Sequence, residues 1–414
     1  MLRILAIFIG VILASGCANP MRVSYLDAVA AQPEPHVTRL YVDGHGSLYP
    51  RDRISSAAVP AADWNGSLFD VFAKACPSAG TGTDSARLCT ALETTDNADK
   101  RDAWFAAQEA MWAERGTEIA MHALARSNEP VIVLMIHGFN NTLAEAAPNF
   151  ALARRLLIEA APDPSKLTFV EVYWDGCSVP GGIGCWAKAQ GSGPLVGFSL
   201  RQLLNAIDAG LGERPSRIRA VTHSSGAFVM GATLGNPGEV LSNLHNRKGY
   251  YYSRFADHAE ATEGVHRIPA IDDLRLAMFA PATPVQTFAG FADADSGLLA
   301  RNVRLFWSIH PRDEVVTKRG LGCGLAGATC MAAKALDYCV TARRSARLDA
   351  AGATRVAFDF DRTGEHWQGR DTKHNFEIYL EQAAKETSIL RELMAPNSSP
   401  VPGLKRYRCP GDPA

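Results

Sequence analysis

The chain has 414 residues, of which 47% are hydrophobic and 21% are charged, and its formal net charge is -1. This composition excludes a disordered chain and predicts a folded body, built as one large domain with insertions or as two smaller domains. The sequence contains no block of like charge, so it predicts no nucleic-acid surface and no polyanionic partner.

The first residues have the pattern of an export signal. Arg3 precedes an apolar run at 4–13 that is too short to span a bilayer and suits the core of a secretory signal. "ASGC" follows at 14–17 and resembles the lipobox of bacterial lipoproteins. The resemblance implies removal of residues 1–16, lipid on Cys17 and, since no Asp follows Cys17, an outer-membrane anchor facing the periplasm. The alternative is an ordinary cleaved signal.

The nine cysteines agree with export. With lipid on Cys17 an even number remains, which predicts disulfide bonds in an exported chain. Nearest neighbours would give Cys76–Cys89 and Cys177–Cys185. The last four allow three pairings, among which the sequence does not choose: Cys323, Cys330, Cys339 and Cys409. No C-x-x-C pair occurs, so we expect no metal site.

Apolar patterning predicts alternating strands and helices. Strands are expected at 37–44, 131–138, 167–174, 217–223, 274–280, 302–309 and 355–360, and helices at 101–125, 143–160, 197–210, 226–234 and 376–394. This alternation is typical of a parallel sheet with helices on both faces. Residues 51–99 show no assignable pattern.

We expect one domain at 36–395, with a tether at 17–35 before it and a Pro-rich tail at 396–414 after it. Two segments interrupt the alternation, at about 175–194 and 236–268. Such insertions are lids or binding loops in some proteins and plain surface loops in others. The first is Gly-rich and bracketed by two cysteines, and we expect it either to shape a substrate entrance or to support the fold.

"THSSG" at 222–226 follows a predicted strand and precedes a predicted helix. A G-x-S-x-G motif in this context presents a nucleophilic serine on a tight turn. Ser224 would be that nucleophile, and Gly226 takes the place of the second glycine. Thr222 replaces the first glycine. The backbone N–H of Ser225 would supply half of an oxyanion hole.

The other half is expected from "IHGFNN" at 136–141, where a predicted strand ends. Phe139 would offer its backbone N–H to the oxyanion. The same residues also suit a plain strand-to-helix turn, with an Asn as the helix cap. The two interpretations are compatible.

A serine nucleophile needs a base and an acid, which the α/β-hydrolase fold supplies downstream in the order acid, then histidine. Asp313 and Glu314 follow the strand predicted at 302–309, and Asp313 is nearer to the strand. His374 lies immediately before the closing helix. His366 is the alternative base.

The set "IHGFNNT", "AVTHSSGA", "SIHPRDEVV" and "KHNFEIY" resembles the α/β-hydrolase superfamily, and more closely a bacterial group with "HGYN" and "HSMG" signatures. The resemblance covers roughly residues 130–390. It implies Ser224 as nucleophile, Asp313 as acid and His374 as base.

The sequence thus predicts a serine hydrolase that cleaves a small or lipid-like ester or thioester through an acyl-enzyme, without a cofactor. One alternative is an amidase or peptidase on the same triad. The other is an inactive hydrolase fold that serves as a binding lipoprotein. The sequence does not indicate the oligomeric state.

Overall fold

The computed structural model describes residues 34–54, 67–76, 81–95, 100–139, 141, 143–176, 183–246, 250–262, 270–283, 302–310, 313, 315–316, 354–359, 374–386 and 389–395. Seven strands in these ranges form one sheet in the order β1-β3-β2-β4-β5-β6-β7, and neighbouring strands are parallel throughout. Their bounds are β1 Val37–Val42, β2 Val131–Ile136, β3 Leu167–Trp174, β4 Arg217–His223, β5 Asp273–Phe279, β6 Asn302–Ile309 and β7 Thr354–Asp359.

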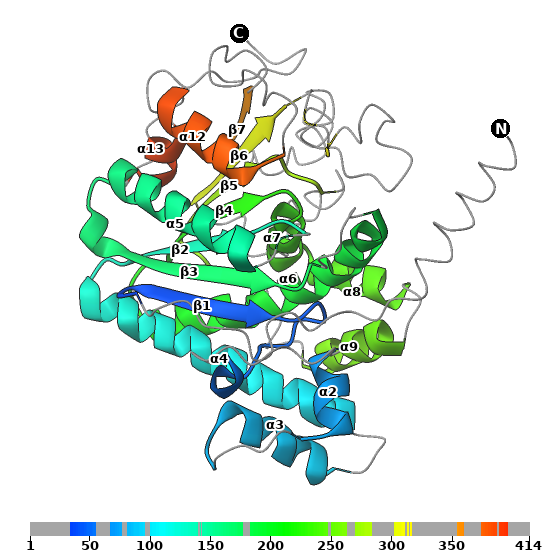
Figure 1. The fold of residues 1–414 in the computed structure, drawn as a ribbon. Coiled ribbons are helices and arrows are strands. Elements are labelled where there is room, and N and C mark those ends of the chain that lie inside the picture. The colour runs from blue at the N-terminus through cyan, green and yellow to red at the C-terminus, as the bar shows by residue number, and fades with distance from the viewer. Residues whose placement is uncertain are drawn as a thin grey trace, which may run out of the picture.

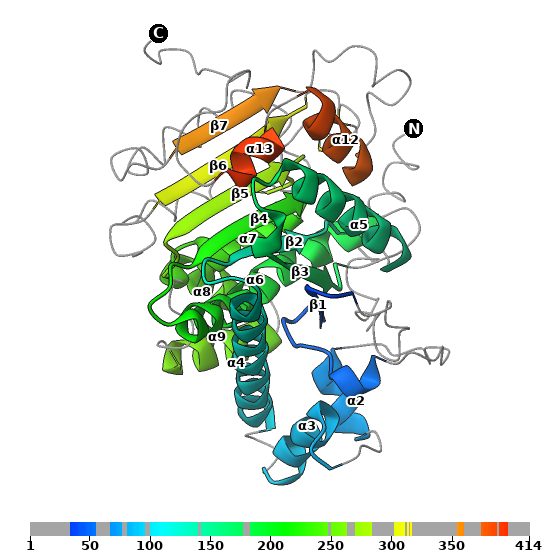
Figure 2. The same cartoon turned by 90° about the vertical axis from the view of Figure 1, so that its left-hand side faces the viewer.

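Helices cover both faces of the sheet (Figures 1 and 2). One face carries α5 (Leu143–Ala160), α12 (Phe376–Glu386) and α13 (Ile389–Met394), which pack on one another. The other carries α4 (Lys100–Arg126), α6 (Ile183–Leu211) and α7 (Gly226–Leu234). β3 is buried along its whole length, as expected of a strand covered on both faces. The predicted α/β class is therefore confirmed.

The helix that includes part of the Gly-rich segment begins earlier than predicted. α6 begins at Ile183 and not near residue 197. Two glycines in this helix, Gly193 and Gly197, allow close packing. A Cβ on Gly193 would lie 3.0 Å from the ring of Phe228, and one on Gly197 would meet the backbone oxygen of Val229. Both neighbours belong to α7, so the missing side chains let α6 and α7 approach closely.

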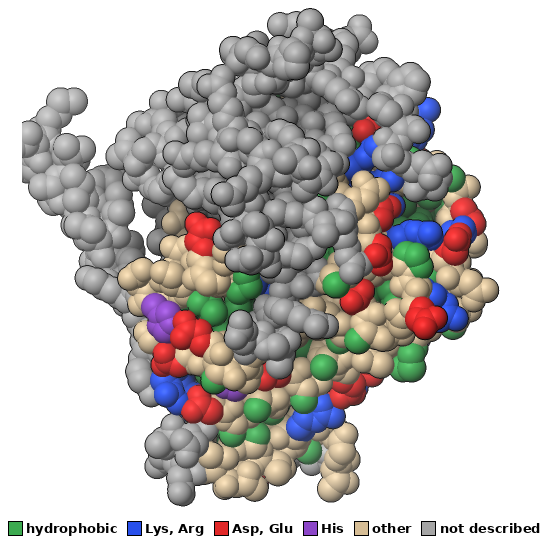
Figure 3. All heavy atoms as spheres, turned by 180° about the vertical axis from the view of Figure 1, so that it is seen from behind, with side chains coloured by type: hydrophobic (Ala, Val, Ile, Leu, Met, Phe, Trp, Pro, Cys, Tyr) green, Lys and Arg blue, Asp and Glu red, His purple; other side chains and the backbone are tan. Residues whose placement is uncertain are grey.

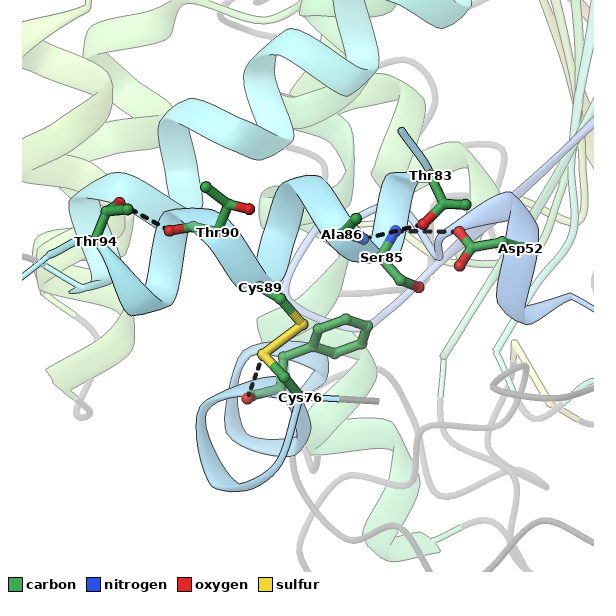
Figure 4. The surroundings of a disulfide bond; sticks show 9 residues. Asp52, Cys76, Thr83, Ser85, Ala86, Cys89, Thr90 and Thr94 are labelled. Atoms are coloured by element: carbon green, nitrogen blue, oxygen red, sulfur yellow. Dashed lines mark hydrogen bonds between the residues drawn. A yellow bond between two sulfur atoms is a disulfide. The ribbon is translucent and has the colours of Figure 1, made fainter. Parts of the chain in front are cut away.

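Within residues 51–99, whose sequence shows no assignable pattern, a small helical unit packs against α4. It comprises η1 (Arg51–Arg53), α2 (Leu68–Lys74) and α3 (Asp84–Glu93). The predicted Cys76–Cys89 disulfide is present and ties the end of α2 to α3 (Figure 4). The side chains of Cys177 and Cys185, and the four C-terminal cysteines, lie outside the described residues.

The second insertion contains α8 (Pro237–His245) and α9 (Tyr250–Ala261), which pack on each other. A short η2 (Pro164–Lys166) leads into β3. On the face opposite to that of Figure 1, acidic and basic side chains of the described residues lie interspersed (Figure 3). Within the described ranges, no helix is long and apolar enough to cross a bilayer. Residues 1–33, with Cys17, and the tail at 396–414 lie outside those ranges.

The order in which the chain adds strands to the sheet changes direction at β2. From β2 it moves to β3 on one side, and from β3 it crosses to β4 on the other. Ligands of open parallel sheets bind beyond the carboxyl ends of the strands at such a reversal. A ligand site is therefore expected beyond Ile136 and His223, the last residues of β2 and β4.

Candidate active site

The two turns that follow β2 and β4 lie against each other. Ile136 pairs with Thr222 in the sheet, so His137-Gly138 and Ser224 leave neighbouring strand ends. A Cβ on Gly138 would lie 2.8 Å from the Cβ of Ser224. Gly138 is therefore required by this close approach, and not by the flexibility of a loop.

Ser224 has a left-handed backbone, with φ 53°. This conformation is uncommon for residues other than glycine and costs free energy, so surrounding bonds must maintain it. Its N–H donates to the oxygen of Phe279 at 2.9 Å, and its carbonyl accepts from Ala282 and Ala227, each at 3.1 Å. These bonds fix the tight turn at the end of β4 from which the serine side chain projects.

Gly226 brings the start of α7 against β2. A Cβ at this position would lie 2.5 Å from the backbone oxygen of Ile136 and 2.9 Å from that of His137. No side chain fits there, as expected for the second glycine of the motif. Thr222, at the place of the first glycine, is fully buried inside β4 and its hydroxyl faces Ala277 of β5.

His374 and Asp313 are hydrogen-bonded. Nδ1 of His374 lies 2.7 Å from Oδ2 of Asp313, which also accepts a bond of 2.6 Å from the Tyr379 hydroxyl. Oδ1 of Asp313 accepts from the N–H groups of Val315 and Val316, both at 2.9 Å. The residue predicted as acid thus contacts the residue predicted as base. Glu314 and His366 lie outside the described residues.

Asp313 is charged at neutral pH. Burial alone would raise the pKa of its carboxyl, but the His374 charge and the hydrogen bonds from His374, Tyr379 and Val316 lower that pKa to about 2. A carboxylate with two backbone donors on one oxygen has a fixed orientation. It therefore positions the imidazole of His374 with Nδ1 toward the acid and Nε2 away from it.

Ser224 and His374 line the same pocket, whose volume is about 820 Å³. Ser224 Oγ and His374 Nε2 are both buried and have no hydrogen-bond partner among the described residues. Nε2 of His223, which lines the same pocket, is a third such atom. Buried polar atoms without a partner are rare in folded proteins, and three in one pocket indicate a place where a ligand or water bonds. The pocket is lined by Phe139, Asn141, Ala144, Glu145, Pro148, Asn149, His223, Ser224, Val315, His374, Asn375, Phe376, Glu377 and Ile378.

Phe139 and Ser225, the predicted oxyanion donors, are also adjacent, but only one of their two backbone N–H groups lacks a bond to a described residue. The N–H of Phe139 donates to the Ser225 hydroxyl at 2.7 Å, so a side chain already engages it. Asn141 closes the turn by donating to the carbonyls of Gly138 and Phe139, each at 3.2 Å. The backbone N–H of Ser225 has no partner within the described part of the chain.

His137 is structural. Its Nδ1 lies 2.6 Å from the carbonyl of Gly138, and its Nε2 accepts from the N–H of Trp174 at 3.1 Å. Burial lowers the pKa of His137 to about 4, so the ring is neutral at pH 7. The ring joins the ends of β2 and β3 and fixes the turn that carries Phe139.

Sequence reasoning missed two residues beside the triad candidates. Tyr379 is fully buried in α12 and donates to Asp313, but nothing in its local pattern distinguishes it from an ordinary core tyrosine. The His223 ring lies 4.7 Å from that of His374 and stacks on Phe376 at 5.0 Å. Burial, together with the nearby His374, places the pKa of His223 well below its usual value, so His223 is neutral.

The described residues therefore define an α/β protein with a candidate Ser–His–Asp site at the carboxyl edge of its sheet. They contain no group of His, Cys, Asp and Glu that could hold a metal ion. No protein-family model matches the chain, and neither the curated proteins nor the solved structures include one with significant similarity to it.

Proposed function

We propose that the protein is a serine hydrolase of the α/β-hydrolase type that cleaves an ester or thioester. Ser224 is the nucleophile, His374 the general base and Asp313 the acid that orients it. The observation that carries the proposal is the 2.7 Å bond between His374 and Asp313, in a pocket shared with a serine of left-handed backbone. Each residue follows the end of a strand or precedes a helix at the same edge of the sheet.

In the acylation step, Ser224 Oγ bonds to the carbonyl carbon of the substrate while His374 Nε2 takes the hydroxyl proton. The electron pair of the carbonyl bond moves to its oxygen, which becomes an oxyanion. Asp313 remains ionised, as its pKa of about 2 requires, and stabilises the imidazolium. The oxyanion then reforms the carbonyl, and the leaving group departs with the proton from His374.

Deacylation repeats these steps with water. His374 takes a proton from the water as its oxygen bonds to the acyl carbon, and the tetrahedral oxyanion forms again. Its collapse breaks the bond to Ser224 Oγ, which recovers its proton from His374. The products are the free acid and the resting enzyme, so no cofactor is required.

The proposed location is the bacterial envelope, with lipid on Cys17 anchoring the protein in the outer membrane. The support is the "ASGC" sequence after a short apolar run. A tethered enzyme would meet small or lipid-like esters at the membrane surface.

Labelling with a fluorophosphonate tests the chemistry directly. We expect one label per protein, mapped to Ser224 by peptide mass spectrometry, and hydrolysis of a short p-nitrophenyl ester. Ser224→Ala should lose labelling and, on the order of 10^6-fold, kcat. His374→Ala should lose kcat similarly, whereas His366→Ala serves as the matched control and should keep most activity. A label on Ser225, or an unreactive wild type, would contradict the proposal.

A further inference from the structure

The Ser225 hydroxyl, at the predicted oxyanion position, has a hydrogen that no described residue accepts. The bond between Phe139 N–H and Ser225 Oγ is 2.7 Å long, and an N–H group can only donate. The oxygen of Ser225 is therefore the acceptor, and its own O–H remains able to donate. Within the described residues, no atom accepts that hydrogen, although Ser225 is only 2% exposed.

Helix capping does not account for the Ser225 side chain. Ser225 is the N-cap of α7, where serine ordinarily accepts a bond from a backbone N–H of the first turn. Here the side chain makes no capping bond, and the residue has helical dihedrals, with φ -69° and ψ -9°. The hydroxyl oxygen instead accepts from the N–H of Phe139, which comes from the turn after β2 and lines the pocket.

We infer that the Ser225 hydroxyl is itself an oxyanion donor, through which the Phe139 N–H acts. This inference rests on the proposed hydrolase function. The oxyanion would accept from the N–H and the Oγ–H of Ser225, while Phe139 donates to Oγ from behind. The N-terminus of α7 adds its positive end at the same place. We call this chain of hydrogen bonds, from Phe139 N–H through Ser225 Oγ to the oxyanion, the relay, and no proton is transferred along it.

The relay has a kinetic consequence. A hydroxyl whose oxygen already accepts a bond is a stronger donor, because hydrogen bonds in a chain polarise one another. Negative charge on the substrate oxygen is greatest in the transition state, so the Ser225 bond strengthens as the reaction proceeds. Its loss should lower kcat and leave KM nearly unchanged.

Ser225→Thr and Ser225→Val form a matched pair for the test. Both add the same bulk, and only threonine keeps the hydroxyl, so strain from the extra atoms is common to the two variants. We expect kcat of the valine variant to be about 10^2-fold below that of the threonine variant, with similar KM values. A short-chain trifluoromethyl ketone, which forms an oxyanion on the serine, should bind the valine variant weaker by a similar factor.

Equal kcat in the two variants would overturn the inference, and so would a faster valine variant. The latter would show that the hydroxyl obstructs the oxyanion hole instead of donating in it. Both outcomes leave the hydrolase proposal intact if wild type is active and labelled on Ser224. An inactive, unlabelled wild type would instead refute the hydrolase proposal itself.

Discussion

Asp313→Asn changes the acid of the candidate triad while keeping its shape. The amide oxygen must face the N–H groups of Val315 and Val316, because an NH₂ group there would set donor against donor. The NH₂ group then faces His374 and Tyr379, where the carboxylate oxygen had accepted two bonds. Nδ1 of His374 can meet this new donor only as an acceptor.

The altered bond selects the wrong tautomer of His374. With Nδ1 as acceptor, the ring proton resides on Nε2, the atom that must accept the proton of Ser224. We expect kcat for a short p-nitrophenyl ester at pH 7 to fall on the order of 10^4-fold. A loss in kcat of less than about tenfold would refute the assignment of Asp313. The weakening of an electrostatic contact alone could account for so small a loss.

Asp313 also makes stability depend on pH. The pKa of its carboxyl is about 2 in the folded protein and 3.8 in the reference state. A pKa that is lowered in the folded state stabilises the fold at pH values above the pKa of the unfolded state. This contribution is lost as the pH falls from 3.8 toward 2. The difference corresponds to about 2 kcal/mol.

Asparagine does not titrate, so the variant isolates this contribution. Urea unfolding at pH 5 and at pH 2 would give the free energy of unfolding of wild type and Asp313→Asn. We expect the advantage of wild type over the variant to shrink by about 2 kcal/mol between these pH values. An advantage that stays constant over this range would show that Asp313 has an ordinary pKa.

Two further predictions concern the turn after β4 and the N-terminus. Gly226→Ala should destabilise the fold by about 1–3 kcal/mol and lower kcat, because its Cβ would lie 2.5 Å from the oxygen of Ile136. Gly238→Ala, whose Cβ would meet only Asn236 Oδ1 at 3.4 Å, is the control and should change stability by less than about 0.5 kcal/mol in the same melts. Cys17→Ser should abolish incorporation of labelled palmitate and leave uncleaved precursor. Palmitate incorporation by that variant would exclude Cys17 as the modified residue.

Much of the fold could be predicted from local patterns. Continuous apolar runs ended by polar or turn residues gave the bounds of β3, β4 and β6, and helical spacing gave those of α5 and α7. Helical spacing predicts α5 despite Pro148, which lies within its first two turns. Because each of these elements is buried on a defined face, the composition and periodicity of its own residues predict it.

Other features depend on contacts between distant segments. Gly193 lies in the segment predicted as an insertion, whereas its role, like that of Gly197, is to admit α7 against α6. The bond from Phe139 to Ser225 joins residues 86 positions apart, and that from Tyr379 to Asp313 joins residues 66 apart. Propensity describes neighbours along the chain, so pairs of this kind become visible only once the sheet has brought the strand ends together.

The strand sequences themselves contain one signal of such long-range pairing. Three strands carry an arginine at their third position, in "RIRAVTH", "DLRLAMF" and "NVRLFWSI". In the sheet Arg219 pairs with Arg275, and Arg275 pairs with Arg304, so the three buried side chains form a row. Asp273 bonds Arg219 at 2.5 Å, and Glu392 of α13 faces the other two.

This row connects the sheet to α12 and α13, the helices that follow the candidate base His374. Arg275 donates to the carbonyl of Glu392 at 2.6 Å, and Arg304 lies 3.4 Å from its carboxylate. Buried charges are costly unless paired, so the position of α13 on β5 and β6 is strongly specified. α13 packs on α12, which begins two residues after His374 and contains Tyr379. The buried arginines thus help to fix the helix pair that follows His374 and contains Tyr379, the two residues that bond Asp313.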